Sequence, residues 1–209
     1  MVMADDTSGS VREEARPADP QARAYADPAP VGLAGFALTT LLLSIINTGL
    51  LKESGAILPV LAVAAFYGGI AQFVAGLFEF RRGNTFGATA FMSYGAFWLT
   101  YWWLVQHLGV AGDVHNALGL YLLGWGIFTA YMAVAALRVS LAVLAVLVLL
   151  TLTYVFLAVG AFQGGAPPRV MTQVGGWLGI VTGLTAWYAS AAAVINATHR
   201  RTLLPTGPR

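Results

Sequence analysis

Residues 27–51 read DPAPVGLAGFALTTLLLSIINTGLL, and this stretch decides the kind of fold that the chain can form. Asp27 can cap a helix, because its carboxylate accepts the free N–H groups of a first turn. Pro28 and Pro30 suit that first turn, where proline has the right φ and its missing N–H is not needed. No charged residue follows until after Leu51. We therefore expect a capped helix that is uncharged over its whole length.

Uncharged stretches of this kind recur along the chain. Six of them contain no Asp, Glu, Lys or Arg: 28–51, 54–78, 83–112, 114–137, 139–168 and 170–199. A helix that crosses the hydrocarbon core needs about 20 apolar residues, so each stretch suffices for one crossing. The chain is 58% hydrophobic and 10% charged, whereas soluble domains carry about 25% charged residues. We predict an all-α polytopic membrane protein with six transmembrane helices, at 31–51, 56–79, 86–107, 115–137, 140–162 and 171–197.

The lysines and arginines are divided unevenly between the two sides of such a bundle. With six crossings both termini share one side, which holds Arg12, Arg16, Arg23, Arg81, Arg82, Arg138, Arg200, Arg201 and Arg209. The other side holds only Lys52 and Arg169. Because cytoplasmic loops carry an excess of Lys and Arg, we predict a multi-pass protein of the cell (inner) membrane with both termini in the cytoplasm. We expect 1–26 to be a disordered cytoplasmic tail, 27–199 the transmembrane domain and 200–209 a short cytoplasmic tail.

The sequence offers little support for a catalytic site or a cofactor site. The chain has no cysteine, and its three histidines (107, 115 and 199) lie apart, at predicted membrane edges. The glycines lack the Gly-Lys-Ser/Thr ending of a phosphate-binding loop. We expect no enzyme, no metal or other cofactor, and no nucleic-acid partner.

Polar side chains inside the predicted helices mark where a solute path could run, because such groups are costly in lipid and usually face the bundle interior or water. Isolated Ser and Thr more often bond back to their own helix. Asn47 and Gln72 can either bond a neighbouring helix or line a pore. As path residues we single out Thr39, Thr40, Asn47, Gln72, Glu79 and Thr89.

Glu79 is the only carboxylate within a predicted helix, and Arg81 and Arg82 follow it closely. We favour an ion pair that anchors the helix at the headgroups over a proton or substrate site. No Lys or Arg lies in mid-membrane, so the solute should be small and held weakly by hydroxyls, amides and helix N-termini. If transport is coupled to protons, the simplest hypothesis is that the proton travels on the substrate acid.

Residues at four-residue spacing mark two helix faces that are suited to close packing. They are Gly68, Gln72 and Gly76 on the second predicted helix, and Gly175, Gly179 and Gly183 on the sixth. Small residues at this spacing let helix backbones approach closely in lipid. The partner helix can belong to the same subunit or to another, and the sequence leaves both open.

Five further motifs follow the first at consistent spacing. They are FYGGIAQ at 66–72 with AG at 75–76, GNTFGATAF at 83–91, SYG at 93–95 with FW at 97–98, GWGIFT at 124–129, and GWLG at 176–179. This ordered set resembles the acetate uptake transporter family, the succinate–acetate permeases of microbes. That family reads Asn-Pro-Ala-Pro-Leu-Gly-Leu at the first motif, so Asp27 and Val31 are departures. The matching residues are Pro28, Ala29, Pro30, Gly32 and Leu33.

The resemblance implies a six-helix protomer, a homohexamer and one pore in each protomer. It implies acetate as substrate and, in some members, succinate and other short carboxylates. A Phe, a Tyr and a Leu narrow the pore in this family, which places the constriction at Phe36, Tyr94 and Leu150. A bulky apolar ring gates by shape and by dewetting. The Asp27–Leu33 motif would lie at the cytoplasmic mouth, with helix N-terminal N–H groups turned to the carboxylate.

Asp27 is the departure with a chemical consequence. The family's Asn is neutral, whereas an ionised aspartate at the mouth would repel acetate. Our hypothesis is that Asp27 keeps the capping role and slightly disfavours anions. The Asp27→Asn variant should then raise acetate uptake near neutral pH.

Three functions are weighed on this basis. The leading one is a channel or proton-linked transporter for acetate and other short carboxylates, and the sequence does not separate channel from symport. The second is a channel for small neutral solutes such as urea or short amides, because fixed charge is scarce. The third is a membrane sensor or assembly protein without flux, for which the charged 1–26 segment is the best support.

Overall fold

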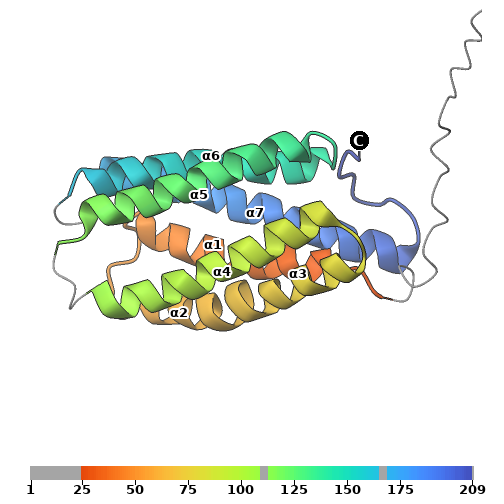
Figure 1. Ribbon diagram of the computed structural model, residues 1–209, viewed down its shortest axis with the longest axis horizontal. Coiled ribbons are helices and arrows are strands. Elements are labelled where there is room, and N and C mark those ends of the chain that lie inside the picture. The colour runs from red at the N-terminus through yellow and green to blue at the C-terminus, as the bar shows by residue number, and fades with distance from the viewer. Residues whose placement is uncertain (1–24, 109–112, 165–168, 209) are drawn as a thin grey trace, which may run out of the picture.

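In the computed structural model, residues 25–108, 113–164 and 169–208 are described, and apart from one isolated bridge their regular structure is helical (Figure 1). The predicted tail 1–26 therefore lies outside the described residues, except for its last two positions. The elements are α1 (Ala29–Asn47), α2 (Ile57–Ala65), η2 (Phe66–Ala71), α3 (Gln72–Arg81), α4 (Thr85–His107), α5 (His115–Ala136), α6 (Leu141–Phe162) and α7 (Val170–His199). The second crossing is formed by α2, η2 and α3 in succession.

The all-helical fold predicted from the sequence is confirmed. Five of the six crossings are long and apolar enough to span a membrane by length and composition. The remaining crossing is α4, which has 23 residues and contains no Asp, Glu, Lys or Arg. At 1.5 Å per residue it is about 35 Å long, which matches the hydrocarbon core.

The bundle is elongated, and its helices run up and down along the long axis (Figure 1). In that view α5 and α6 lie along one side, α2, α3 and α4 along the other, and α1 and α7 run between them. The first described residues and the C-terminus lie at the same end of the bundle. The bundle therefore has one end that holds the termini and one opposite end.

Local chemistry explains most helix boundaries. Asn84 and Ser140 cap α4 and α6, since their side-chain oxygens accept N–H groups of the first turn. α1 ends at Asn47, four residues before the predicted end at 51. Gly49 has a φ of +78°, a left-handed conformation that ends the helix at little cost for glycine.

The regularly spaced glycines pack against helices of the same chain. A Cβ on Gly68 would lie 2.5 Å from Thr39 Oγ1, and one on Gly183 would lie 3.1 Å from the carbonyl oxygen of Ala37. Both partners lie on α1. The sequence left open whether these glycines pack within one subunit or between subunits. At these two positions the contact lies within one subunit.

Residues 200–208 fold back over the end of the bundle. Asn196 accepts the N–H of Leu204 through Oδ1 (3.0 Å) and donates through Nδ2 to the Leu204 carbonyl oxygen (2.8 Å). Further on, the carbonyl oxygen of Gly207 accepts the N–H of Leu141 at 2.9 Å. That N–H belongs to the first turn of α6, so the C-terminal segment satisfies a donor that would otherwise lack a partner.

Candidate functional site

A cavity of about 120 Å³ lies at the end of the bundle that holds the termini, and we call it the near cavity. Its wall comes from α1, α3, α4 and α6 and from the turns beside them. Most of its lining is apolar, and the polar side chains in it are Gln72, Glu79, Asn84 and Tyr94. The path and constriction residues expected from the sequence that line it are Ala29, Leu33, Phe36, Gln72, Glu79, Tyr94 and Leu150.

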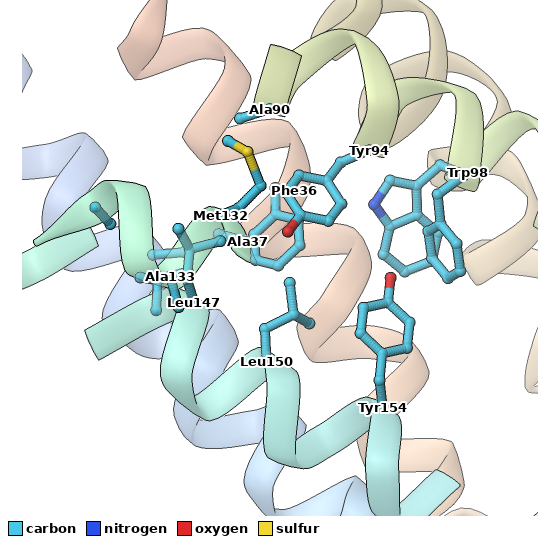
Figure 2. Packing of buried hydrophobic residues seen from close by; sticks show 14 of the residues in the cluster. Phe36, Ala37, Ala90, Tyr94, Trp98, Met132, Ala133, Leu147, Leu150 and Tyr154 are labelled. Carbon is cyan, nitrogen blue, oxygen red and sulfur yellow. The ribbon is translucent and has the colours of Figure 1, made fainter. Parts of the chain in front are cut away.

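Phe36, Tyr94 and Leu150 converge at the inner end of the near cavity (Figure 2). They come from α1, α4 and α6, and each is at most 4% exposed. The Phe36 and Tyr94 rings lie 5.7 Å apart between centroids. The Tyr94 hydroxyl donates to Thr129 Oγ1 at 3.0 Å, which fixes the tyrosine against α5. The three residues belong to one buried hydrophobic cluster, and below we refer to them together as the Phe36–Tyr94–Leu150 ring.

A second cavity, the far cavity, has a volume of about 340 Å³ and lies toward the opposite end. Its lining begins one to two turns beyond the ring, at Leu43 on α1, Phe97 on α4 and Tyr154 on α6. It continues to Asn47, His115 and Arg169. Phe36, Tyr94 and Leu150 line the near cavity, and on each of their helices the next residue that lines the far cavity lies one to two turns further on.

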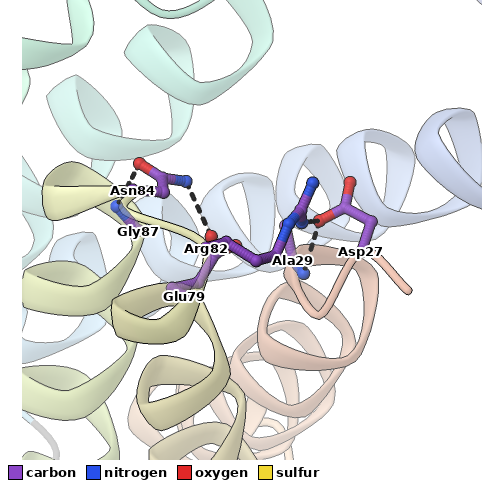
Figure 3. A network of polar contacts seen from close by, with 6 residues as sticks. All are labelled: Asp27, Ala29, Glu79, Arg82, Asn84 and Gly87. Atoms are coloured by element: carbon purple, nitrogen blue, oxygen red, sulfur yellow. Dashed lines mark hydrogen bonds and ion pairs between the residues drawn. The ribbon is translucent and has the colours of Figure 1, made fainter. Parts of the chain in front are cut away.

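Glu79 lies in the wall of the near cavity and not at an ion pair (Figure 3). It has no exposed surface, its Oε2 accepts from Asn84 Nδ2 at 2.8 Å, and its Oε1 has no partner. The predicted ion pair with Arg81 or Arg82 is wrong. The Glu79 carboxylate is bonded to Asn84. Arg82 follows the last residue of α3, and its guanidinium is paired with another carboxylate, that of Asp27.

Asp27 is that carboxylate (Figure 3). Its Oδ1 lies 2.5 Å from Arg82 Nη1 and accepts the N–H of Ala29 at 3.1 Å. The predicted helix contact of Asp27 is thus present, with Pro28 as the N-cap residue. The negative charge of Asp27 is balanced locally by Arg82, which the sequence did not indicate.

Several residues expected on the path line neither cavity. Thr39 is buried and donates to the carbonyl oxygen of Gly35 at 2.8 Å, the back-bonding favoured from the sequence for isolated threonines. Gly32 is covered by the Phe91 ring, which a Cβ would approach to 2.6 Å. The other predicted path residues outside the cavity walls are Asp27, Pro28, Pro30, Thr40 and Thr89. Asn47 lines the far cavity.

Asn84 and Arg169 line the two cavities although the sequence singled out neither as a path residue. Asn84 caps α4, because its Oδ1 accepts the Gly87 N–H at 3.1 Å. Its second role with Glu79 depends on Gly87, where a Cβ would lie 2.8 Å from Glu79 Cδ. In the described part of the chain, no three His, Asp or Glu side chains gather closely enough to hold a metal ion.

A family model described as the GPR1/FUN34/yaaH family matches residues 9–208. The chain belongs to this family. A relative within it is the succinate-acetate/proton symporter SatP of Escherichia coli (strain K12), 44% identical over 186 residues that cover 87% of this chain and 95% of SatP. Acetate permease A of Emericella nidulans is 36% identical over 200 residues, which cover 88% of this chain and 67% of the permease.

A solved structure described as that of the bacterial acetate channel SatP has the same fold. It matches with a TM-score of 0.79 and 42% sequence identity, and the match covers 88% of this chain and 99% of that one. The GPR1/FUN34/yaaH family also contains ammonia transport outward protein 2 of Saccharomyces cerevisiae, 37% identical over 194 residues that cover 88% of this chain and 66% of the yeast protein. The fold, the two cavities and these relatives together mark a membrane transport protein.

Proposed function

We propose that this protein is a channel or proton-linked transporter for acetate and other short carboxylates such as succinate. The solute crosses each protomer through the near cavity, the Phe36–Tyr94–Leu150 ring and the far cavity. The observation that carries the proposal is the presence of two cavities on opposite sides of one buried ring. The names of relatives that carry succinate and acetate support the substrate class.

The near cavity would hold a carboxylate weakly. The amides of Gln72 and Asn84 can donate hydrogen bonds to it, and the cavity lining contains no Lys or Arg. Weak binding favours rapid release, which conduction requires. The three ring residues are at most 4% exposed, which supports a narrow constriction that a solute passes when these side chains move.

For the assembly we propose a homohexamer in the cell (inner) membrane with both termini in the cytoplasm. The excess of Lys and Arg on the side of the termini supports this orientation. Leu120, Ile127 and Val134 lie seven residues apart on α5 and are 63%, 63% and 67% exposed. Such an apolar stripe needs lipid or another copy of the chain to cover it.

A channel for small neutral solutes is the second candidate, because the ring carries no charge and neither cavity presents a mid-membrane cation. A sensor without flux is the third. The proposed path leaves the N-terminal tail outside the transport route, so a protein that lacks residues 1–24 should still conduct acetate if transport is the main role.

The test is flux of labelled acetate into vesicles that contain the purified protein, compared with urea flux and with protein-free vesicles that report the leak of acetic acid. We expect acetate flux well above the leak and no comparable urea flux. Flux that follows the acetate gradient alone indicates a channel, and uphill accumulation driven by an imposed pH gradient indicates proton coupling. Urea flux without acetate flux would overturn the proposal.

A further inference from the structure

The far cavity differs from the near cavity in its charge. Most of its wall is apolar or aromatic, but Arg169 and His115 belong to it, together with the amide of Asn47. These residues come from the end of α1 and from the starts of α5 and α7.

Arg169 is half-buried and has no acidic partner among the residues that the structure describes. Its one hydrogen bond runs from Nη1 to the carbonyl oxygen of Gly160, at 3.4 Å. A weak bond to a neutral carbonyl leaves the guanidinium charge uncompensated. Arg82, at the opposite mouth, is by contrast paired with Asp27.

His115 forms a pair with Asp113 at the same mouth. His115 Nδ1 lies 2.5 Å from Asp113 Oδ1, and the His115 N–H donates to the same oxygen at 3.3 Å. The side-chain hydrogen bond from His115, followed by the backbone one, lowers the pKa of the Asp113 carboxyl below its ordinary value. Asp113 is therefore ionised near neutral pH, and its carboxylate is engaged by His115.

Asp113 belongs to this pair and does not line the far cavity. Among the described residues that line the cavity, Arg169 is the one Lys or Arg, and there is no Asp or Glu. The wall of the far cavity therefore presents a fixed positive charge and no carboxylate.

We propose that the far cavity is an anion-recruiting vestibule, in which Arg169 supplies a fixed positive charge to the incoming carboxylate. This inference rests on the proposed function. A cavity with low-dielectric walls focuses the field of such charges and raises the local concentration of the anion. Recruitment would therefore affect the rate at low substrate concentration and not the maximal rate.

Equilibrium exchange of labelled acetate in proteoliposomes tests the fixed charge, because equal concentrations on both sides make the result independent of protein orientation. Arg169→Gln removes the charge but keeps a hydrogen-bond donor for Gly160. We expect it to lower the exchange rate at low acetate by about threefold in low salt. In 1 M salt, where the Debye length falls to about 3 Å, the variant and the parent should agree.

Two further variants separate charge from structure. Arg169→Lys keeps the charge and should exchange at the parent rate. Lys52→Gln removes the other cation from this side of the chain, and Lys52 does not line the cavity, so its exchange rate should change little. An equal loss in Arg169→Gln and Arg169→Lys, or a loss that persists in 1 M salt, would show a structural role and overturn the inference.

The outcomes distinguish a failure of the vestibule from a failure of the proposed function. If the parent shows no exchange above protein-free vesicles, the proposed function itself fails; if it exchanges but Arg169→Gln is unaffected at low salt, only the vestibule fails.

Discussion

Within the proposed pore, three side chains set the width of the path at its narrowest point. Phe36→Ala removes a ring that is 4% exposed, and Tyr94→Ala does the same from α4. We expect each to raise the flux of succinate relative to acetate, because the longer solute is limited most by width. The measurement is the ratio of the two fluxes per assembled protein in vesicles.

The same variants also remove core packing, since Phe→Ala in a core costs about 3–5 kcal/mol. Phe36→Leu keeps more side-chain volume than Phe36→Ala. It should shift the ratio of succinate flux to acetate flux in the same direction, with less loss of assembly. Phe80→Ala is the matched control, because Phe80 is 58% exposed and lines neither cavity. A parental flux ratio in well-assembled Phe36→Ala and Tyr94→Ala proteins would remove these residues from the constriction.

Asp27 and Arg82 form an exposed pair whose effect should be on flux and not on stability. Exposed ion pairs contribute about 0–1 kcal/mol. The sequence-based hypothesis attributes a gain in Asp27→Asn to the loss of a repelling carboxylate; the structure adds that this variant would also free Arg82. We expect acetate exchange at low acetate to rise about twofold in Asp27→Asn and to fall in Arg82→Gln.

The double variant distinguishes charge from local geometry at this mouth. Asp27→Asn combined with Arg82→Gln restores the parental net charge, so its exchange rate should return toward that of the parent. Rates that are unchanged in all three proteins, at equal protein levels and low salt, would show that this pair does not influence the solute.

Asn84 joins the start of α4 to Glu79, so its replacement should reduce stability. Asn84→Ala loses a cap and the one side-chain hydrogen bond that the Glu79 carboxylate accepts within the described part of the chain, and the free energy of unfolding should fall by about 1–3 kcal/mol. Asn84→Ser keeps a cap acceptor, so its free energy of unfolding should fall less. Thermal unfolding of the detergent-solubilised proteins measures the order of stability. Equal unfolding midpoints for the parent and Asn84→Ala would contradict this prediction.

At the scale of the elements, the C-terminal segment connects α7 to the start of α6. Asn196→Ala removes the side-chain bonds that hold this segment, and the unfolding midpoint should fall by about 2–6 °C. Thr198→Ala is the matched control, because Thr198 bonds only to its own helix. If both variants unfold at the parental temperature, the segment does not stabilise the bundle.

Most helix positions could be predicted because charged residues flank the uncharged stretches. Arg138, for example, separates α5 from α6. The π-helical turn η2 was not predicted, since its sequence is as apolar as that of the helices around it. Gly68 and Gly69 within it approach Thr39 and Leu99 closely, so tertiary packing and not local sequence accounts for this segment.

At the scale of the whole molecule, the sequence predicted the path incompletely. Phe36, Tyr94 and Leu150 lie far apart in the chain, and the resemblance to a family, not periodicity, placed them on one ring. The pairing of Asp27 with Arg82 joins residues 55 positions apart and could not be read from neighbouring charges. The sequence did not indicate that Arg169 and His115, which lie far apart in the chain, line the same far cavity.

The central claim is that acetate crosses the protomer through the Phe36–Tyr94–Leu150 ring, and obstructing that ring tests it most directly. Leu150 is 3% exposed within the ring, whereas Leu152 on the same helix is 42% exposed and lines neither cavity. Acetate exchange in proteoliposomes should be abolished in an assembled Leu150→Trp protein and remain at the parental rate in Leu152→Trp. Parental exchange by an assembled Leu150→Trp protein would show that the solute takes another route.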